Sequence, residues 1–298
     1  MLYRIMGRVL NRFDPWRGKL CTCPPKYSYS PYVGCSHACR YCYITAYIKD
    51  AFKPRPKKRV IDRLLRDVQF LPKLPVAVST SSEPYMPMER RFELTRRSLE
   101  VLVRFGFPIL IVTKSSMVVR DIDILRRGDI VVSITITTVS GEVARRLEPG
   151  APSPEERLKA VKILLENRIK TTVRIDPLIP SINVEGVEKL VRRLSEIGVG
   201  HITSSTYKAK RDSFHRVVEA FPEKEDILHK FYWGRGRWIG RSRYLEDEMR
   251  RNILKRVREA CSENGMSFAT CREGNVIEWL GRCSCDSSHL LSWRLESI

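Results

Sequence analysis

The sequence lacks a long apolar run: nowhere do the roughly 18 consecutive apolar residues of a membrane-spanning helix occur. Its first residues, MLYRIMGRVLNRF, also lack a continuous apolar segment followed by a small-residue cleavage site, the pattern of a secretory signal. We therefore expect a cytoplasmic protein with no membrane partner. With 298 residues, 43% of them hydrophobic and 30% charged, the chain is typical of soluble globular proteins.

The cysteine content does not suggest a disulfide framework. Nine cysteines, an odd number, occur in a chain far longer than the small secreted domains that disulfides stabilise. Most of them stand in groups, which are Cys21 with Cys23, then Cys35, Cys39 and Cys42, then Cys283 with Cys285, leaving Cys261 and Cys271 single. Such grouping indicates metal binding.

Acidic residues are few relative to basic ones. Lys and Arg total 54, Asp and Glu total 34, and the formal net charge is +20. A charge of this size indicates a polyanionic partner, most often a nucleic acid. The alternative is the heavily charged surface of a heat-adapted protein, although that adaptation usually adds both signs of charge.

From about residue 60 onward, short β-rich segments alternate with amphipathic segments, the pattern of βαβ units on a parallel sheet. A first strand is expected near residues 27–33, before the cysteine triplet. Later strands are expected at residues 75–81, 108–114, 129–137, 170–179 and 201–207. This alternation is compatible with a closed barrel and with an open doubly wound sheet.

Three of the intervening helices have clear boundary signals. Ser153 and Glu156 predict a capping box at the start of a helix over residues 154–167. Apolar residues at helical spacing predict a second helix over residues 187–198, which ends at a glycine. Acidic residues at the start and an apolar face predict a third helix over residues 246–263.

The segment SPYVGCSHACRYCYI contains the pattern C-x3-C-x2-C, formed by Cys35, Cys39 and Cys42. Three thiolates on one short loop can hold three corners of a 4Fe–4S cube and leave the fourth iron without a protein ligand. That iron can be chelated by the amino and carboxylate groups of S-adenosylmethionine (SAM). An electron from the cluster can then cleave SAM to a 5′-deoxyadenosyl radical, which abstracts hydrogen from unactivated carbon.

The alternative for this loop is a zinc site. Zinc usually recruits four ligands and favours two C-x2-C pairs, and Cys39 with Cys42 is the only such pair in the chain. Tyr41 and Tyr43 stand on both sides of Cys42, which favours a cluster that must be shielded and must hold an adenine.

The motif C-x3-C-x-aromatic-C at the end of the first strand of a β/α repeat resembles the signature of the radical SAM superfamily. This resemblance implies an α/β fold, a partial (β/α)6 TIM-type barrel over residues 28–207. Residues 1–27, which contain Cys21 and Cys23, would then form an N-terminal segment. Residues 208–298 would form a C-terminal basic, aromatic and cysteine-containing extension.

Longer segments resemble the spore photoproduct lyase-related (DNA repair photolyase-like) group of that superfamily. They are SPYVGCSHACRYCY, STSSEPYMPMERRFELTRRSLEVL, VTKSSMVVRDIDIL, VSITITT, LEPGAPSPEERLKAV and DPLIP. The resemblance implies that polar residues at the ends of strands two to four and a lysine after strand three hold SAM. By position the expected SAM-binding residues are Tyr41, Ser81, Ser82, Lys114, Ser133 and Thr135, with Arg174 on strand five as a further candidate.

One position departs from the pattern of that group. Spore photoproduct lyase uses a cysteine near the end of strand two as a hydrogen donor, whereas this chain has Ser79 and Thr80 there. Because a hydroxyl O–H bond is too strong to replace a thiol, the sequence argues against the lyase reaction itself. Tyr41, Tyr43 and Tyr85 are the candidates for radical transfer, with simple packing as the alternative.

The remaining cysteines lie near the two ends of the chain. Cys21 with Cys23 and Cys283 with Cys285 form C-x-C pairs, and Cys271 is a fifth thiol. If the ends meet, these residues predict a second iron–sulfur cluster or a structural zinc. The alternative is that they are free, buried thiols.

The segment FYWGRGRWIGRSRY interleaves arginines with aromatic residues. Arginines can pair with phosphates while aromatic rings stack on exposed bases. The predicted nucleic-acid contacts are Arg235, Arg237, Trp238, Arg241 and Arg243. The alternative is that the aromatic rings pack on the barrel and the arginines are solvated.

The sequence thus predicts a radical SAM enzyme that acts on a nucleic acid, either in DNA repair or in modification of an RNA such as tRNA. A ferredoxin or flavodoxin is the expected electron donor. One alternative directs the same radical chemistry at a protein or small metabolite. Another is a non-catalytic nucleic-acid-binding protein with zinc on its cysteines.

Overall fold

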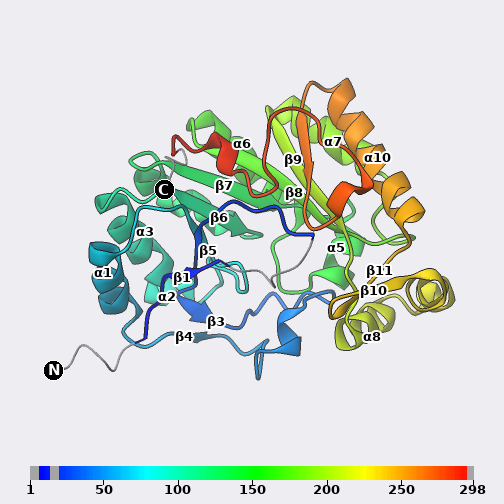
Figure 1. The fold of residues 1–298 in the computed structure, drawn as a ribbon, viewed down its shortest axis with the longest axis horizontal. Coiled ribbons are helices and arrows are strands. Elements are labelled where there is room, and N and C mark those ends of the chain that lie inside the picture. Colours follow the sequence, from blue (N-terminus) through cyan, green and yellow to red (C-terminus); the bar gives the residue numbers. More distant parts are fainter. Residues whose placement is uncertain (1–6, 14–19, 294–298) are drawn as a thin grey trace.

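The computed structural model describes residues 7–13 and 20–293. Within these residues, the main sheet has eight strands in the order β1-β2-β5-β6-β7-β8-β9-β12 (Figure 1). The strands from β2 to β12 in this order pair in parallel, and the edge strand β1 runs antiparallel to β2. Their bounds are β1 Asn11–Arg12, β2 Tyr27–Tyr29, β5 Val76–Val78, β6 Ile109–Thr113, β7 Ile130–Thr135, β8 Lys170–Leu178, β9 His201–Thr206 and β12 Ser267–Thr270.

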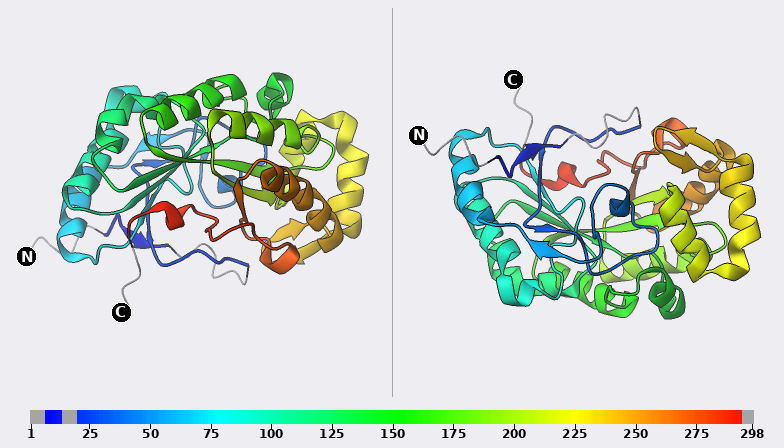
Figure 2. Two further views of the ribbon diagram at one scale, coloured as in Figure 1. Left: turned by 90° about the horizontal axis from the view of Figure 1, so that it is seen from above. Right: turned by 90° about the horizontal axis from the view of Figure 1, so that it is seen from below.

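Helices line the outer side of this curved sheet (Figure 2). The longer ones are α1 Val60–Phe70, α3 Leu94–Arg104, α6 Pro154–Glu166, α7 Val187–Ile197, α8 Arg211–Ala220 and α10 Asp247–Glu263. The shorter ones are α2 Glu89–Phe92, α4 Ile122–Leu125, α5 Gly141–Leu147 and α9 Glu225–His229. Two small antiparallel pairs lie outside the main sheet, β3 Tyr32–Val33 with β4 Arg55–Pro56 and β10 Arg237–Ile239 with β11 Ser242–Tyr244.

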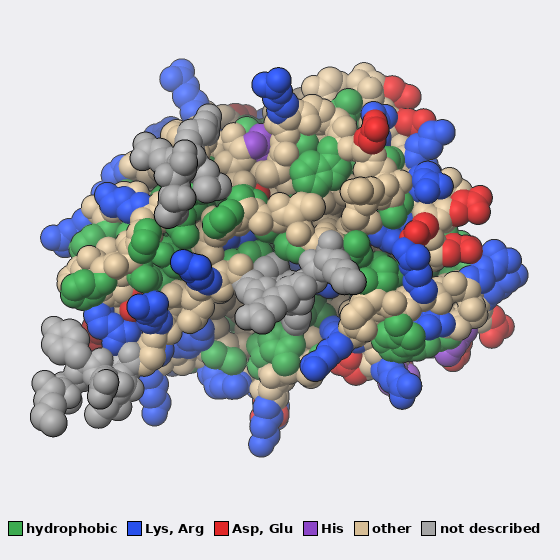
Figure 3. All heavy atoms as spheres, viewed as in Figure 1, with side chains coloured by type: hydrophobic (Ala, Val, Ile, Leu, Met, Phe, Trp, Pro, Cys, Tyr) green, Lys and Arg blue, Asp and Glu red, His purple; other side chains and the backbone are tan. Residues whose placement is uncertain are grey.

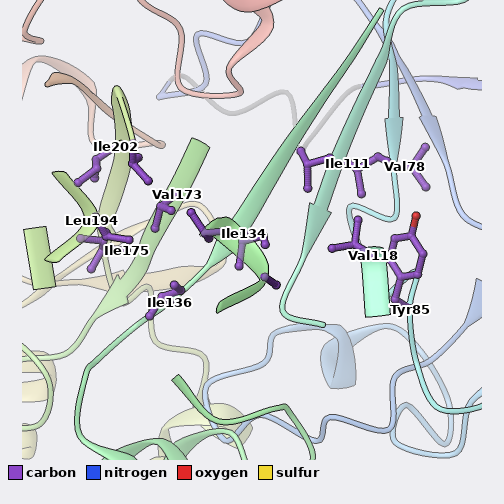
Figure 4. Close-up of a cluster of buried hydrophobic side chains, with 14 of the residues drawn as sticks. Val78, Tyr85, Ile111, Val118, Ile134, Ile136, Val173, Ile175, Leu194 and Ile202 are labelled. Atoms are coloured by element: carbon purple, nitrogen blue, oxygen red, sulfur yellow. The ribbon is translucent and has the colours of Figure 1, made fainter. Parts of the chain in front are cut away.

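The two faces of the sheet differ in polarity because successive side chains of a strand point to opposite sides. Apolar side chains on one face pack against the helices, among them Val78, Ile111, Ile134, Val173 and Ile202 (Figure 4). On β7, Ser133 and Thr135 alternate with these core positions and therefore face the inner side of the sheet. The inner face thus offers polar groups to a ligand.

All six strands expected from the sequence are present, and the α/β partial barrel is confirmed. The pattern did not predict β12, which has only four residues and follows directly after α10. This strand pairs in parallel with β9. Residues 208–298 therefore contribute a strand to the same sheet as residues 28–207.

The three helices with boundary signals are also confirmed. In α6, Glu156 N donates to Ser153 Oγ at 3.3 Å, and Ser153 N donates to the Glu156 carboxylate at 2.7 Å. Helix α7 ends at Gly198, whose φ of +99° lies in the left-handed region. Helix α10 places the fully buried Cys261 on its apolar face.

The two end segments of the chain meet. Leu20 packs on the backbone of Gly274, and Lys26 forms a buried ion pair with Asp286. A search of the described residues finds no helix with the length and apolarity needed to cross a membrane.

We expect Ser153→Ala to lower the free energy of unfolding by about 1 kcal/mol, because the N-cap oxygen of α6 is lost. Chemical denaturation measures this loss. Ser262→Ala, at an exposed position of α10, is the matched control and should change stability by less than about 0.5 kcal/mol. Equal effects of the two substitutions would contradict the capping role.

Candidate active site

The cysteine loop, residues 34–42, follows β3 and lies near the carboxyl ends of the parallel strands, where active sites of such sheets form. Its entry requires a glycine, since Gly34 has a φ of +79° and a Cβ there would lie 2.7 Å from the Ala51 carbonyl oxygen. Cys35 N donates to that same carbonyl at 2.8 Å, and Cys42 N donates to the Cys39 carbonyl at 3.0 Å. The loop backbone is therefore well anchored.

The segment after α5 holds the middle of the cysteine loop. Arg40 N donates to the Leu147 carbonyl at 2.9 Å, and Gly150 N donates to the His37 carbonyl at 3.0 Å. A Cβ at Gly150 would lie 2.3 Å from the Ser36 carbonyl oxygen, so the two segments touch backbone to backbone.

Helix α8 holds the end of the loop. The Arg216 guanidinium donates to the Cys42 carbonyl at 2.7 Å, and the Thr45 hydroxyl donates to Asp212.

A buried charge network lies beside the loop. The Tyr41 hydroxyl donates to Glu148, and Glu148 pairs with the fully buried Arg157 at 2.6 Å. The Lys114 ammonium lies 5.6 Å from the centre of the Tyr41 ring. Burial works against the charge of Lys114, but the Cys39 and Glu148 groups raise its pKa above the ordinary value. Lys114 is therefore a cation held close to the thiols.

A second buried carboxylate, Glu83, organises the neighbouring strand ends. It accepts hydrogen bonds from the Thr113 hydroxyl, from Tyr85 N at 3.0 Å and from Lys114 N at 2.9 Å. His37 Nδ1 lies 3.7 Å from Glu83. Burial lowers the pKa of His37, although Glu83 opposes this shift.

Burial of the three thiols disfavours their thiolate forms. Burial, and next the charge of Glu83, raise the pKa of Cys35 to about 12. Burial also raises the pKa of Cys39 and of Cys42. Because metals bind thiolates, loading of this loop must release protons.

The expected SAM-binding residues lie along the inner side of the sheet and its rim. The Ser82 hydroxyl oxygen is buried and has no hydrogen-bond partner in the part of the chain that the structure describes. Ser81 lines a pocket of about 170 Å³. Ser133 is buried on β7 and accepts from the Thr172 hydroxyl at 3.0 Å, and Thr135 follows two residues later.

Arg174 on β8 pairs with Thr135 on β7, but its guanidinium donors serve another site. One guanidinium nitrogen donates to the Cys285 carbonyl at 2.9 Å and another pairs with Asp176 at 2.8 Å. These contacts place Arg174 beside the C-terminal cysteines.

The three tyrosines differ in environment. Tyr41 belongs to the charge network, and the Tyr43 hydroxyl donates to the Thr80 carbonyl at 2.8 Å. Tyr85 is fully buried and packs near Val78 and Val118 in the apolar core (Figure 4). The role of Tyr85 in radical transfer stays a prediction, with packing in the apolar core as the alternative.

Four of the five remaining cysteine candidates come together. Cys23 Sγ lies 3.8 Å from Cys285 Sγ, Cys23 also interacts with Cys21, and Cys285 interacts with Cys271. Cys283 does not join them, because its thiol donates to the Phe268 carbonyl at 3.3 Å. Within residues 7–13 and 20–293, neither this set nor the cysteine loop has three side chains already placed as ligands of a single metal ion.

Three of the five predicted nucleic-acid contacts are engaged within the protein, and two are exposed. Arg243 serves the fold, since it donates to the Tyr232 carbonyl at 2.7 Å and to the Trp233 carbonyl at 2.9 Å. Arg237 pairs with Asp247 at 2.7 Å, and Arg235 lies 3.6 Å from Glu246. Arg241 and Trp238 are exposed near the turn of the β10–β11 hairpin.

Sequence reasoning missed the buried carboxylates and their partners. Glu83, Glu148 and Arg157 were not proposed as site residues, although all three lie in segments whose resemblance to known relatives was noted. Acidic residues shortly after a strand, as in SSEPY, and directly after a helix, as in RLEPG, were the available signal.

A parallel α/β barrel with three thiols on one loop at its carboxyl rim defines a class of enzyme that holds a metal cluster there. Comparison with known proteins places the chain within this class. The sequence profile of the Radical SAM superfamily matches residues 29–194. The chain belongs to the radical SAM superfamily and is a radical SAM enzyme.

Relatives occur in archaea, bacteria and viruses. The uncharacterized protein MJ0683 of Methanocaldococcus jannaschii is 31% identical over 211 residues, which span 68% of this chain and 79% of that one. The uncharacterized protein Rv2578c of Mycobacterium tuberculosis is 29% identical over 61% of this chain and 58% of its own length. The radical SAM Nalpha-GlyT isomerase of Pseudomonas phage M6 is 23% identical over 65% of this chain and 42% of its own length.

Solved structures share the fold. Spore photoproduct lyase complexed with dinucleoside spore photoproduct superposes with a TM-score of 0.65 at 16% identity, over 88% of this chain and 80% of that chain. Streptococcus suis SuiB bound to S-adenosylmethionine superposes with a TM-score of 0.55 at 15% identity, over 82% of this chain and 49% of that chain.

We expect Glu148→Gln to lower the free energy of unfolding of the metal-free protein by about 3 kcal/mol, because the Arg157 guanidinium stays buried without its carboxylate partner. Urea denaturation measures the change. Glu142→Gln, which alters an exposed carboxylate on α5, should cost less than about 1 kcal/mol. A Glu148 variant as stable as this control would show that the network contributes little.

Proposed function

We propose that this chain binds a 4Fe–4S cluster through Cys35, Cys39 and Cys42, cleaves SAM reductively, and directs the resulting radical at a nucleic acid. The observation that carries the first part is the anchored loop with its three thiols beside the half-buried Lys114 cation. When bound, the cluster supplies one electron to the sulfonium of SAM and so generates a 5′-deoxyadenosyl radical. The superfamily implies both the cluster and SAM.

The residues around the loop suit that role. Three thiols from one loop are the ligand set of a cluster that keeps one iron open. Lys114 offers a half-buried cation to the SAM carboxylate, while the unpartnered Ser82 hydroxyl and the inward-facing Ser133 and Thr135 offer hydrogen bonds. Arg174 is less suited, since its donors are already used by Asp176 and the Cys285 carbonyl.

The chain lacks a thiol at the end of β5. Ser79 follows that strand with a φ of +61°, and its buried hydroxyl has no hydrogen-bond partner among the described residues. A serine there cannot deliver a hydrogen atom to a carbon radical as a thiol does. The proposal is therefore a radical reaction on a nucleic acid other than the lyase reaction.

The reductive cleavage of SAM is tested by anaerobic reconstitution with iron and sulfide, reduction with dithionite, and chromatography for 5′-deoxyadenosine. We expect wild-type protein to produce it and Cys39→Ala to lose it, because the cluster is then missing a ligand. Cys261→Ala, in the apolar core of α10, is the control and should keep the activity. A folded wild-type protein that retains zinc and yields no deoxyadenosine would overturn the assignment.

Charge and position support a nucleic-acid substrate. Lys and Arg side chains are spread over the face shown in Figure 3, while Asp and Glu gather toward one side of it. The β10–β11 hairpin is tied to the loop after β9, because Ala209 N and Arg243 N each donate to the other residue's carbonyl, at 2.9 and 2.7 Å. Helix α8 starts just after the loop that follows β9, and it also contacts the cysteine loop. The hairpin therefore stands at the rim near the candidate active site.

On this hairpin, Trp238 and Arg241 are the best-placed contacts. The Trp238 side chain is 48% exposed and packs edge-on against Trp233, with ring centres 5.8 Å apart. An exposed, supported ring of this kind can stack on an unpaired base. The solved spore photoproduct lyase complex with a dinucleoside photoproduct gives a precedent of the same fold for a nucleic-acid substrate.

Fluorescence anisotropy with single-stranded DNA and with tRNA, over a salt series, tests whether Trp238 and Arg241 contact a nucleic acid. We expect Trp238→Ala to weaken binding about tenfold, the loss of one stacked base. Arg241→Gln should reduce the slope of log affinity against log salt by about 1. Arg104→Gln, exposed at the end of α3, should weaken binding less. No salt-dependent binding of either nucleic acid would favour a peptide or metabolite substrate instead.

A further inference from the structure

Four thiols from distant parts of the chain lie together beside β12. Cys21 and Cys23 come from the N-terminal segment, Cys271 from the end of β12, and Cys285 from the C-terminal loop. We propose that these four cysteines form a second metal centre with four thiolate ligands, separate from the cysteine loop. The proposal does not depend on the identity of the substrate.

The spacing of the thiols fits a shared metal. Cys23 Sγ and Cys285 Sγ are 3.8 Å apart, and two sulfurs bound at 2.3 Å to one tetrahedral metal lie about 3.8 Å apart. Cys21 adjoins Cys23, and Cys271 adjoins Cys285, so the four thiols form a continuous group. Side-chain rotation is needed to bring them round one ion or cluster, as it is for the cysteine loop.

Ligand backbones on the C-terminal side are fixed. Cys271 N donates to the Ser204 carbonyl at 3.0 Å as β12 ends. The Cys285 carbonyl accepts hydrogen bonds from Arg174 at 2.9 Å and from the Thr203 hydroxyl at 3.2 Å. Backbone positions held in this way lower the ordering cost of binding a metal.

The segment that carries Cys21 and Cys23 packs against the C-terminal residues that carry Cys271 and Cys285. A Cβ at Gly274 would lie 2.9 Å from Leu20 Cδ2, so Leu20 packs directly on that backbone. Lys26 pairs with Asp286, the residue after Cys285. The segment that carries Cys21 and Cys23 is therefore seated on the C-terminal loop at both of its ends.

The surrounding charges suit an anionic centre. Four thiolates around a divalent metal leave a net charge of about −2, which needs nearby cations when it is shielded from water. Lys26 is 3% exposed and interacts with Cys23 and Cys285. Arg174 and Lys208, 12% and 13% exposed, interact with Cys271.

Two cysteines outside the group show the contrast. Cys261 lies alone in the apolar core of α10, and Cys283 turns its thiol to the Phe268 carbonyl. Neither stands among cations. The four clustered cysteines therefore differ from Cys261 and Cys283, which lie apart from other thiols.

A metal at this place would tie the start of the chain to its end. The segment with Cys21 and Cys23 leads into β2, next to the edge strand β1, whereas Cys271 follows β12 at the other edge of the sheet. Bonding Cys21 and Cys23 to Cys271 and Cys285 would therefore tie the segment before β2 to the residues after β12.

The test uses the full chain with Cys35, Cys39 and Cys42 all changed to alanine, so that the first cluster is absent. After anaerobic purification, we expect elemental and sulfide analysis to find either about one zinc or a set of irons with sulfide per chain. Zinc identifies a structural ion and iron with sulfide an auxiliary cluster, and both support the proposal. Adding Cys23→Ser and Cys271→Ser should remove the metal, whereas adding Cys283→Ser should leave it.

A second measurement needs no further cysteine substitution and covers the case in which the Cys23 and Cys271 variants fail to fold. In the wild-type chain, bound metal should protect Cys21, Cys23, Cys271 and Cys285 from alkylation, and a chelator should expose them and lower the melting temperature. A folded triple variant without metal, metal that survives loss of Cys23 and Cys271, or a disulfide between Cys23 and Cys285 would each overturn the proposal.

Discussion

The Glu148 carboxylate is buried between the Tyr41 hydroxyl, the Arg157 guanidinium and the charge of Lys114. These partners come from the cysteine loop, from α6 and from the end of β6, so one carboxylate joins three separate parts of the rim. Burial opposes its ionisation, but the two cations hold the pKa of Glu148 below its ordinary value. Because an unpaired buried charge is strongly destabilising, the cysteine loop can take its position only where these partners meet.

The sheet separates stability from chemistry by its two faces. The outer face packs apolar side chains against helices, and the inner face presents hydroxyls and charges that the rim and the end segments of the chain satisfy. The same pleat that sends Ile134 to the core sends Ser133 and Thr135 inward. A radical enzyme gains from this division, since the polar inner face can bind a cosubstrate while the rigid outer layers exclude water.

Membership in the radical SAM superfamily establishes the type of chemistry, and the local surroundings suggest its target. The fold is shared with spore photoproduct lyase, solved in complex with a dinucleoside photoproduct, and with SuiB, solved bound to a precursor peptide. The basic charge of the chain and the exposed Trp238 and Arg241 beside the rim favour the nucleic acid. The serine at the end of β5 is the reason for proposing a reaction other than that of the lyase.

The sequence by itself determined the six central strands, the capping box of α6 and the cysteine triplet, because these features depend on periodicity and on spacing within short segments. Lys114 was suggested only by the resemblance to the lyase-related group. Only the tertiary structure decided which distant groups meet. It brought Cys21 and Cys23 to Cys271 and Cys285, excluded Cys283, assigned Arg243 to the fold, and surrounded Glu148 with cations. Contacts between residues far apart in the sequence depend on strand order and on the path of the end segments. Short sequence patterns do not contain that information.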